Sequence, residues 1–435
     1  MCKTRIKKIL FLIPILAFCL LINGSLKAQF LVNSDSAFKA GTPNSGRLWG
    51  YTFGDFYYKA HSDSLNRGGN NQYTGIPKNR NAFQFRRIYL GYDYNISKNF
   101  STELLLAAED NFPAFNPPSN SAANGDELSD GKLSFYIKLA DIRWKNVWRG
   151  TDLIVGQQAT PAFPLLSEKI WNYRSVERTI ADIRRTPSYD MGVGLQGLFD
   201  PSTKNFGYDI LIGNGTGAKP AATSFKWFYG DIYHYFLDKK VVVDVYADYQ
   251  RLNWTPTWHH DRQMWKGFAA YTTPALTIGV EGFVNTIRND TKATLVGGGA
   301  DTINTAAQGI SFYIHGNIVK NKLRFFARFD RYNPNKKIDN DTYKSYSGIS
   351  SPNGYNSNSY EATYNSSGGV ASVTPTGDIT SKESFVTVGL DFTPYKNVHF
   401  MPNIWYNHYS SQLTGVSNGD YDLVYRMTFY FVFGK

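Results

Sequence analysis

Cysteine is nearly absent from the chain, whose 435 residues include only Cys2 and Cys19. Both precede residue 29, where we expect a cleaved leader to end, so the mature chain would contain none. A disulfide framework, a cysteine-ligated metal and a thiol nucleophile are therefore excluded. The same absence suits a protein that is exported through an oxidising compartment.

Long apolar runs are also missing after the leader, so we expect no membrane-spanning helix. A mature chain placed in a membrane must then form a closed barrel, because only a barrel satisfies the backbone of spanning strands. The formal charge is +11, and the leader carries five basic residues and no acidic one, which leaves about +6 for the mature chain. Nucleic acid is excluded as a partner because no recognition motif accompanies this modest charge.

The first 28 residues have the pattern of a signal peptide. Basic residues between positions 3 and 8 precede an apolar stretch over 9–22, and Ala28 supplies a small residue for cleavage. A lipoprotein site at Cys19 is the alternative, but bulky Phe18 precedes it where a small residue is required. We predict a signal peptide over 1–28 and a single domain over 29–435.

Aromatic residues are abundant at 16%, and they follow a period-two alternation that is typical of strands. Near the C-terminus, Tyr425, Met427 and Phe429 share one face, while Arg426 and Thr428 share the other. An apolar face opposite a polar face is what a barrel wall between lipid and water requires. We predict about sixteen strands, at 48–60, 82–94, 100–109, 133–144, 151–158, 188–199, 206–214, 223–237, 240–251, 263–273, 275–288, 308–319, 321–333, 383–393, 396–409 and 421–433. The fourth strand changes face, which predicts a bulge near Ala140.

The connections between these segments alternate long and short, as in outer-membrane barrels with short periplasmic turns and long outside loops. The dipeptide Lys-Asn occurs at four short turns, ending at Asn99, Asn146, Asn321 and Asn397. Asn tolerates the positive φ of tight hairpin turns. A large soluble β-sandwich or propeller is the alternative, but it does not explain the long-short rule. We predict an all-β transmembrane barrel.

The stretches 85–92, 153–164, 176–178 and 187–195 resemble, in this order, motifs of one family, the phosphate-selective porins O and P. The stretch Phe85–Tyr92 resembles the second-strand signature of that family, and 153–164 resembles its Gly-Gln-Gln segment followed by Pro-Ala-Phe-Pro. Val176-Glu177-Arg178 and the later 187–195 segment resemble its Glu-Arg and Asp-x-Gly-Val pattern. The specific likeness covers about residues 80–200.

The resemblance implies a sixteen-stranded barrel, a homotrimer, and a third outside loop that folds into the lumen as a constriction. The third long connection, 159–187, occupies that position, and apolar residues between Glu168 and Ile183 have helix-like spacing. Basic residues line the pore of the family and attract anions. Here the candidates for the constriction are Lys169, Arg174, Arg178, Arg184 and Arg185. The dense arginine ladder of the family is not evident on the strands, so phosphate selectivity does not carry over.

Alternation also predicts which charged residues of the wall point into the lumen. The basic ones are Arg87, Arg324, Arg328 and Arg426, among carboxylates such as Glu109, Asp244, Glu281 and Asp391. Arginine suits anions because its charge is permanent and its fork binds two oxygens. The alternative role is mutual pairing that fills the interior.

Other functions have weaker support in the sequence. His259-His260 beside Asp261 suggests a metal site, but no partner has metal-ligand spacing, so we expect a solvated loop. No Gly-x-Ser-x-Gly or other catalytic motif is present, and we expect neither an enzyme nor a bound cofactor.

The sequence thus predicts a porin of the bacterial outer membrane for passive diffusion of small hydrophilic solutes, with a weak preference for anions and with phosphate and other oxyanions among the solutes. Two alternatives stay open. One is an oligosaccharide porin that uses lumen aromatics (Tyr89, Tyr246, Tyr313, Trp405), and the other is an adhesive barrel that displays the 334–382 loop.

Overall fold

The computed structural model describes residues 42–68, 71–109, 134–184, 187–221, 224–255, 258–348, 362–364, 370–373, 380–415 and 419–434. The signal peptide predicted over 1–28 and the constriction candidate Arg185 lie outside the described residues.

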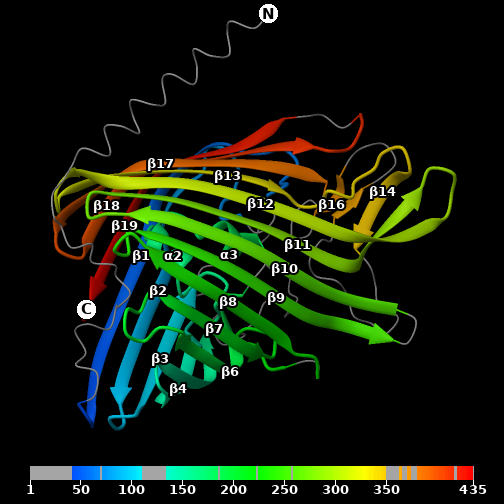
Figure 1. Ribbon diagram of the computed structural model, residues 1–435. Coiled ribbons are helices and arrows are strands. Elements are labelled where there is room, and N and C mark those ends of the chain that lie inside the picture. Colours follow the sequence, from blue (N-terminus) through cyan, green and yellow to red (C-terminus); the bar gives the residue numbers. More distant parts are fainter. Residues whose placement is uncertain are drawn as a thin grey trace, which may run out of the picture.

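Sixteen antiparallel strands form a closed barrel, as predicted (Figure 1). Each strand pairs with its neighbour along the chain, β13 pairs with β17, and β1 pairs with β19 to close the ring. The strands of the wall are β1 (Ser45–His61), β2 (Asn81–Asn95), β3 (Phe100–Glu109), β4 (Tyr136–Trp148), β5 (Thr151–Ala159), β6 (Tyr189–Leu198), β7 (Phe206–Gly213), β8 (Trp227–Phe236), β9 (Val241–Thr255), β10 (Trp258–Thr272), β11 (Leu276–Leu295), β12 (Ala300–Val319), β13 (Leu323–Asn333), β17 (Ser381–Tyr395), β18 (Val398–Ser411) and β19 (Asp420–Phe433).

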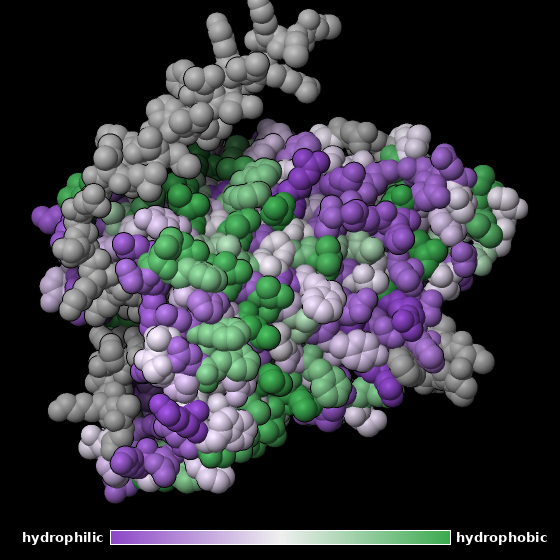
Figure 2. Space-filling view, viewed as in Figure 1, coloured by the Kyte–Doolittle hydropathy of each residue, from purple (hydrophilic) through white to green (hydrophobic). Residues whose placement is uncertain are grey.

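The period-two pattern separates the two faces of the wall. On β19, Tyr425 and Met427 are 48% and 42% exposed on the outside, whereas Arg426 and Thr428 are buried inside. Figure 2 shows apolar side chains spread over the outer surface of the barrel, with polar ones dense near the long strand ends on the right. An apolar outer face and a charged interior are the arrangement of a strand wall between lipid and water.

The short turns use the residues that the repeated Lys-Asn dipeptide predicted. Asn146, Asn321 and Asn397 all have positive φ, between 50° and 66°. The fourth predicted position, Asn99, is not among the residues with positive φ. Three of the four dipeptides therefore supply the left-handed residue that a tight connection needs.

Two bulges alter the inward pattern of the wall. The first bulge is in β4. Leu139 and Ile137 of this strand pair with the consecutive residues Leu105 and Leu106 of β3, so Lys138 is the extra residue, two positions from the predicted bulge. In β2, Phe53 and Gly54 of β1 pair with Arg87 and Phe85, which leaves Arg86 extra. Both extra side chains are buried in the interior. Each bulge therefore adds one cation to the lumen.

Two of the connections predicted as long loops are largely strand. β9 runs to Thr255 and β10 begins at Trp258, and β11 and β12 continue as a hairpin that turns between Leu295 and Ala300. The short strand β14 (Tyr343–Gly348) pairs with the end of β11 beyond the barrel. These strand ends extend past the rest of the wall on the right of Figure 1. Pairing satisfies the backbone there, so the chain continues as strands instead of open loops. The remaining strands, β15 (Ala362–Tyr364) and β16 (Val370–Val373), pair with each other.

Candidate pore constriction

The third loop (160–188) connects β5 to β6 and folds into the lumen, as predicted. It contains two short helices, α2 (Ser167–Trp171) and α3 (Ile180–Arg184), and Figure 1 places both inside the barrel. Asn172 has φ 55° and ends α2, so the predicted helical stretch is broken into two pieces. The apolar residues Trp171, Val176 and Ile180 are buried against the wall.

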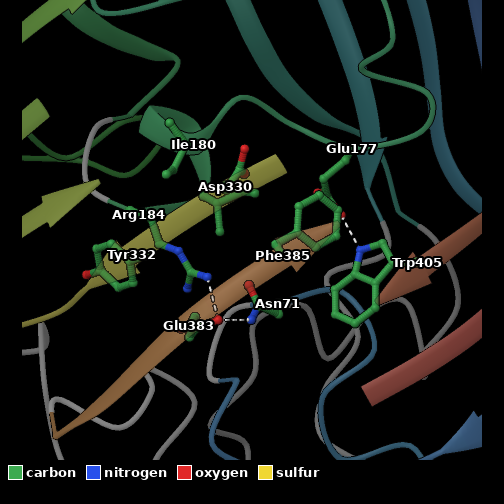
Figure 3. Close-up of a pocket in the computed structure, with 10 residues that line it drawn as sticks. Asn71, Glu177, Ile180, Arg184, Asp330, Tyr332, Glu383, Phe385 and Trp405 are labelled. Carbon is green, nitrogen blue, oxygen red and sulfur yellow. Dashed lines mark hydrogen bonds and ion pairs between the residues drawn. The ribbon is translucent and has the colours of Figure 1, made fainter. Parts of the chain in front are cut away.

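Side chains of the third loop bind the wall at β17 and β18. Trp405 Nε1 donates to Glu177 Oε2 at 2.7 Å, and Tyr173 donates to Asp391 at 3.2 Å. Arg184 pairs with Glu383 at 2.7 Å (Figure 3). Burial by itself raises the pKa of Glu177, but the charges of Arg178 and Arg426 outweigh burial and hold this pKa below its ordinary value. Glu177 is therefore ionised at neutral pH and strengthens its bond to the indole.

Three wall arginines hold the backbone of the same loop. Arg86 donates to the carbonyls of Ser175 and Val176, Arg426 donates to Val176 O at 3.0 Å, and Arg328 donates to Arg178 O. Arg328 and Arg426 were predicted to line an open lumen. The structure places them against the loop, where they donate to backbone carbonyls of the segment between α2 and α3.

The first loop (62–80) also folds inward, which the sequence did not predict. Tyr73 is fully buried, donates to Asp55 at 2.9 Å and packs against Trp405 with ring centroids 5.4 Å apart. Asn71 donates to Glu383, and Gln72 accepts from Arg86, both at 2.6 Å. Nothing in its Gly- and Asn-rich composition distinguishes this segment from a solvated loop.

A small cavity lies where the two loops meet the wall (Figure 3). Asn71 and Glu177 line it together with Arg184, Glu383 and Trp405. It has room for about one water molecule. The two loops therefore fill this side of the lumen, and a larger solute has to pass elsewhere.

The opposite side of the third loop faces β1–β6 across the remaining lumen, which we call the eyelet. On the loop side, the side chains of Glu168, Arg174 and Arg178 are 16%, 15% and 25% exposed. Arg174 interacts electrostatically with Tyr51 and Tyr89 of the facing wall. On the wall side, Arg87, Glu109 and Lys138 are each about one-tenth exposed. These groups are charges of the constriction that stay partly accessible.

The charges of the eyelet are paired. Glu109 lies 2.8 Å from Arg87 and 2.5 Å from Lys138. Arg174 bonds Glu168 and lies 3.1 Å from Asp182, which is 3.9 Å from Arg178. Four cations thus share the eyelet with three carboxylates, so the pairing predicted as the alternative role is present and a single positive charge remains in excess.

The other predicted residues are distributed around this site. Arg324 donates to His315 Nδ1 at 3.0 Å, below the third loop, and Lys169 is exposed on α2. Arg86 and Lys138 were missed because alternation points them outward. The tandem Arg86-Arg87 inside an alternating strand was the available signal, since one of two adjacent arginines must break the pattern.

The pair His259-His260 does not lie in a solvated loop, which corrects that prediction. Both residues belong to β10, and His260 is buried with Nε2 3.2 Å from Asp290 Oδ1. Strand β10 extends further out than the sequence pattern indicated. Across the described part of the chain, no group of three or more His, Cys, Asp or Glu side chains is arranged to hold a metal ion.

Within the described ranges, no helix is long and apolar enough to cross a membrane.

Comparison with known proteins gives a likeness in structure only. No protein-family model and no curated sequence matches the chain. The outer membrane channel DcaP of Acinetobacter baumannii matches with a TM-score of 0.55 and 9% identity, over 91% of this chain and 99% of that one.

Two further solved structures match nearly as well. OmpF of Salmonella typhi in complex with daunomycin has a TM-score of 0.52 at 11% identity, over 90% of this chain and 98% of that one. The anion-selective porin from Comamonas acidovorans has the same score and identity, over 90% and 100%. The chain therefore has the barrel fold of outer-membrane porins.

Proposed function

We propose that the chain is a porin of the bacterial outer membrane that passes small hydrophilic solutes by passive diffusion. The observation that carries this proposal is a closed barrel, apolar outside and charged inside, whose third loop narrows the lumen to an eyelet. The leader over 1–28 supports export by a signal peptide. Transport through such a pore needs no cofactor and no catalytic group.

We further propose a weak preference for anions, with phosphate among the solutes that pass. Four cations face three carboxylates in the eyelet, and Lys169 adds a positive charge on the exposed face of α2. Salt screens charges over about 8 Å, so one excess charge biases ion flow without selecting a single ion. The resemblance to the phosphate-selective family agrees with a preference for anions. Because the charges of the eyelet are paired, we expect this preference to be weaker than in that family.

The resemblance to that family also supports a homotrimer embedded in outer-membrane lipid. Chemical crosslinking of the purified protein in detergent checks this part of the proposal. A ladder that ends at three subunits is expected, whereas a single band would oppose it.

Planar-bilayer recording of the purified mature chain tests the pore. We expect stepwise conductance increases and, in a salt gradient, a small reversal potential displaced toward the equilibrium potential of chloride. A displacement toward potassium would oppose the anion preference. A complete lack of steps would remove the porin and favour a barrel that displays its outer ends, such as the β11–β12 hairpin with β14, for adhesion.

A further inference from the structure

Four tyrosines form a continuous surface on the wall side of the eyelet. This tyrosine band comprises Tyr51, Tyr89, Tyr136 and Tyr189, from β1, β2, β4 and β6. The ring centroids of Tyr51 and Tyr89 are 4.4 Å apart, and those of Tyr136 and Tyr189 are 6.2 Å apart. The Lys138 ammonium joins the two pairs, because it lies 5.1 Å from the Tyr89 ring centre and 4.8 Å from that of Tyr189.

The hydroxyl groups of Tyr89, Tyr136 and Tyr189 are held by hydrogen bonds. Tyr89 donates to Glu109 Oε1 at 2.6 Å, and Tyr189 donates to the Tyr136 hydroxyl at 3.0 Å. The rings of Tyr51, Tyr136 and Tyr189 are partly exposed, whereas Tyr89 is buried behind them. The band therefore offers rigid aromatic faces with polar edges.

Across the eyelet, the third loop presents charged hydrogen-bonding groups whose charges are balanced by ion pairs with each other. Arg174 bonds Glu168 and Asp182, and it acts electrostatically on Tyr51 and Tyr89. A paired guanidinium and carboxylate retain spare donors and acceptors, yet they attract a free ion weakly. A solute in the eyelet meets aromatic faces on one side and a neutral, polar surface on the other.

We propose that the eyelet binds neutral saccharides, a solute class that uses both sides. The C–H face of a sugar ring packs on an aromatic ring, and its hydroxyls accept from and donate to charged groups, whose hydrogen bonds are the strong ones. Inorganic anions have no apolar face and gain nothing from the band. This inference rests on the proposed porin function.

Of the four aromatics named from the sequence, Tyr89 belongs to this surface, and Tyr246, Tyr313 and Trp405 do not. Tyr246 and Trp405 are 0% and 1% exposed, because Tyr246 packs in the core with Phe163 and Ile180 of the third loop and Trp405 packs against Tyr73 of the first loop. The wall residues of the eyelet named above all lie on strands between β1 and β6. The structure thus moves the aromatic surface to the opposite half of the barrel.

The test is the block of single-channel current by maltotriose in planar bilayers. We expect maltotriose to block the wild-type current reversibly, while the same concentration of phosphate does not. In Tyr51→Leu, which removes the most open ring of the pair, the half-blocking concentration should rise about tenfold, equivalent to ~1.4 kcal/mol. Tyr51→Phe keeps the ring and should stay within about twofold of wild type.

The control is Tyr425→Leu, which removes a tyrosine from the lipid-facing side of β19 and should leave the block unchanged. Channels that conduct normally but are not blocked by maltotriose would overturn the saccharide site and leave the porin intact. If Tyr51→Phe lost as much block as Tyr51→Leu, stacking of the sugar on the Tyr51 ring would be excluded. Stronger block by phosphate than by maltotriose would assign the eyelet to anions.

Discussion

Arg86 is a wall residue that binds both of the inward-folded loops. It is the extra residue of the β2 bulge, pairs with Asp55 at 2.6 Å, and donates to Gln72 of the first loop and to two carbonyls of the third. We predict that Arg86→Met releases this part of the third loop and produces larger, noisier single-channel currents.

The magnitude follows from the bonds that are lost. Hydrogen bonds from a charged donor each contribute about 1.5–3 kcal/mol, so losing two to the loop backbone costs about 3 kcal/mol at the low end. Each 1.4 kcal/mol is a factor of ten, so the detached population rises about a hundredfold. Arg426 still donates to Val176 O, which keeps the loop from leaving entirely.

A second effect of the substitution is separable from the first. Removing Arg86 takes the ion-pair partner from buried Asp55, which keeps its hydrogen bonds from Tyr73 and Thr428, and breaking a buried ion pair costs about 3–5 kcal/mol. The double variant Asp55→Asn, Arg86→Met should recover thermal stability, measured by circular dichroism, but not the quiet current. The two readouts therefore distinguish barrel stability from loop anchoring.

The matched control is Arg143→Met, which removes a lumen arginine that bonds Asp152 and Gln196 on neighbouring strands. Its conductance noise should equal that of wild type. The reasoning would be refuted if Arg86→Met had the same conductance and noise as wild type while remaining folded.

Three further predictions concern the loop, the eyelet and the wall. Because surrounding cations lower the pKa of Glu177, its bond to the wall should persist at neutral pH and weaken only when pH falls below the ordinary pKa of a glutamate, about 4.3, so current noise in bilayers should not rise above that pH. Lys138→Met removes an eyelet cation and should shift the reversal potential in a salt gradient toward potassium, whereas Lys322→Met in a turn should not. Gly156 has φ 131°, and a Cβ added there would lie 2.3 Å from a backbone oxygen. Gly156→Ala should therefore lower the free energy of unfolding, measured by urea titration, by about 1–3 kcal/mol. Gly267 has open space around it, so Gly267→Ala should leave this free energy unchanged.

The barrel itself could be predicted from the sequence because its signal is local. A strand that separates lipid from water must alternate apolar and polar residues, as on β19, and this constraint repeats in every strand whatever its neighbours are. Turn chemistry is equally local, which is why Asn146, Asn321 and Asn397 were found at their turns. The position of the third loop inside the lumen could be predicted only from the order of the strands together with the family resemblance.

Which inward-facing residues line the open part of the lumen was decided only by the tertiary structure. The alternation of the strands predicts that Arg328 and Arg426 face inward. It does not predict that carbonyls of the third loop accept hydrogen bonds from them. Single bulges reversed the expected direction of Arg86 and Lys138, and Tyr73 folds inward onto Asp55 and onto Trp405, which is far away in the sequence. Whether an inward charge binds solute or loop depends on which backbone lies opposite, and that is set by long-range packing. The sequence by itself therefore determined a barrel with a charged interior, and the packing of two loops against one half of the wall decided which of those charges face the eyelet.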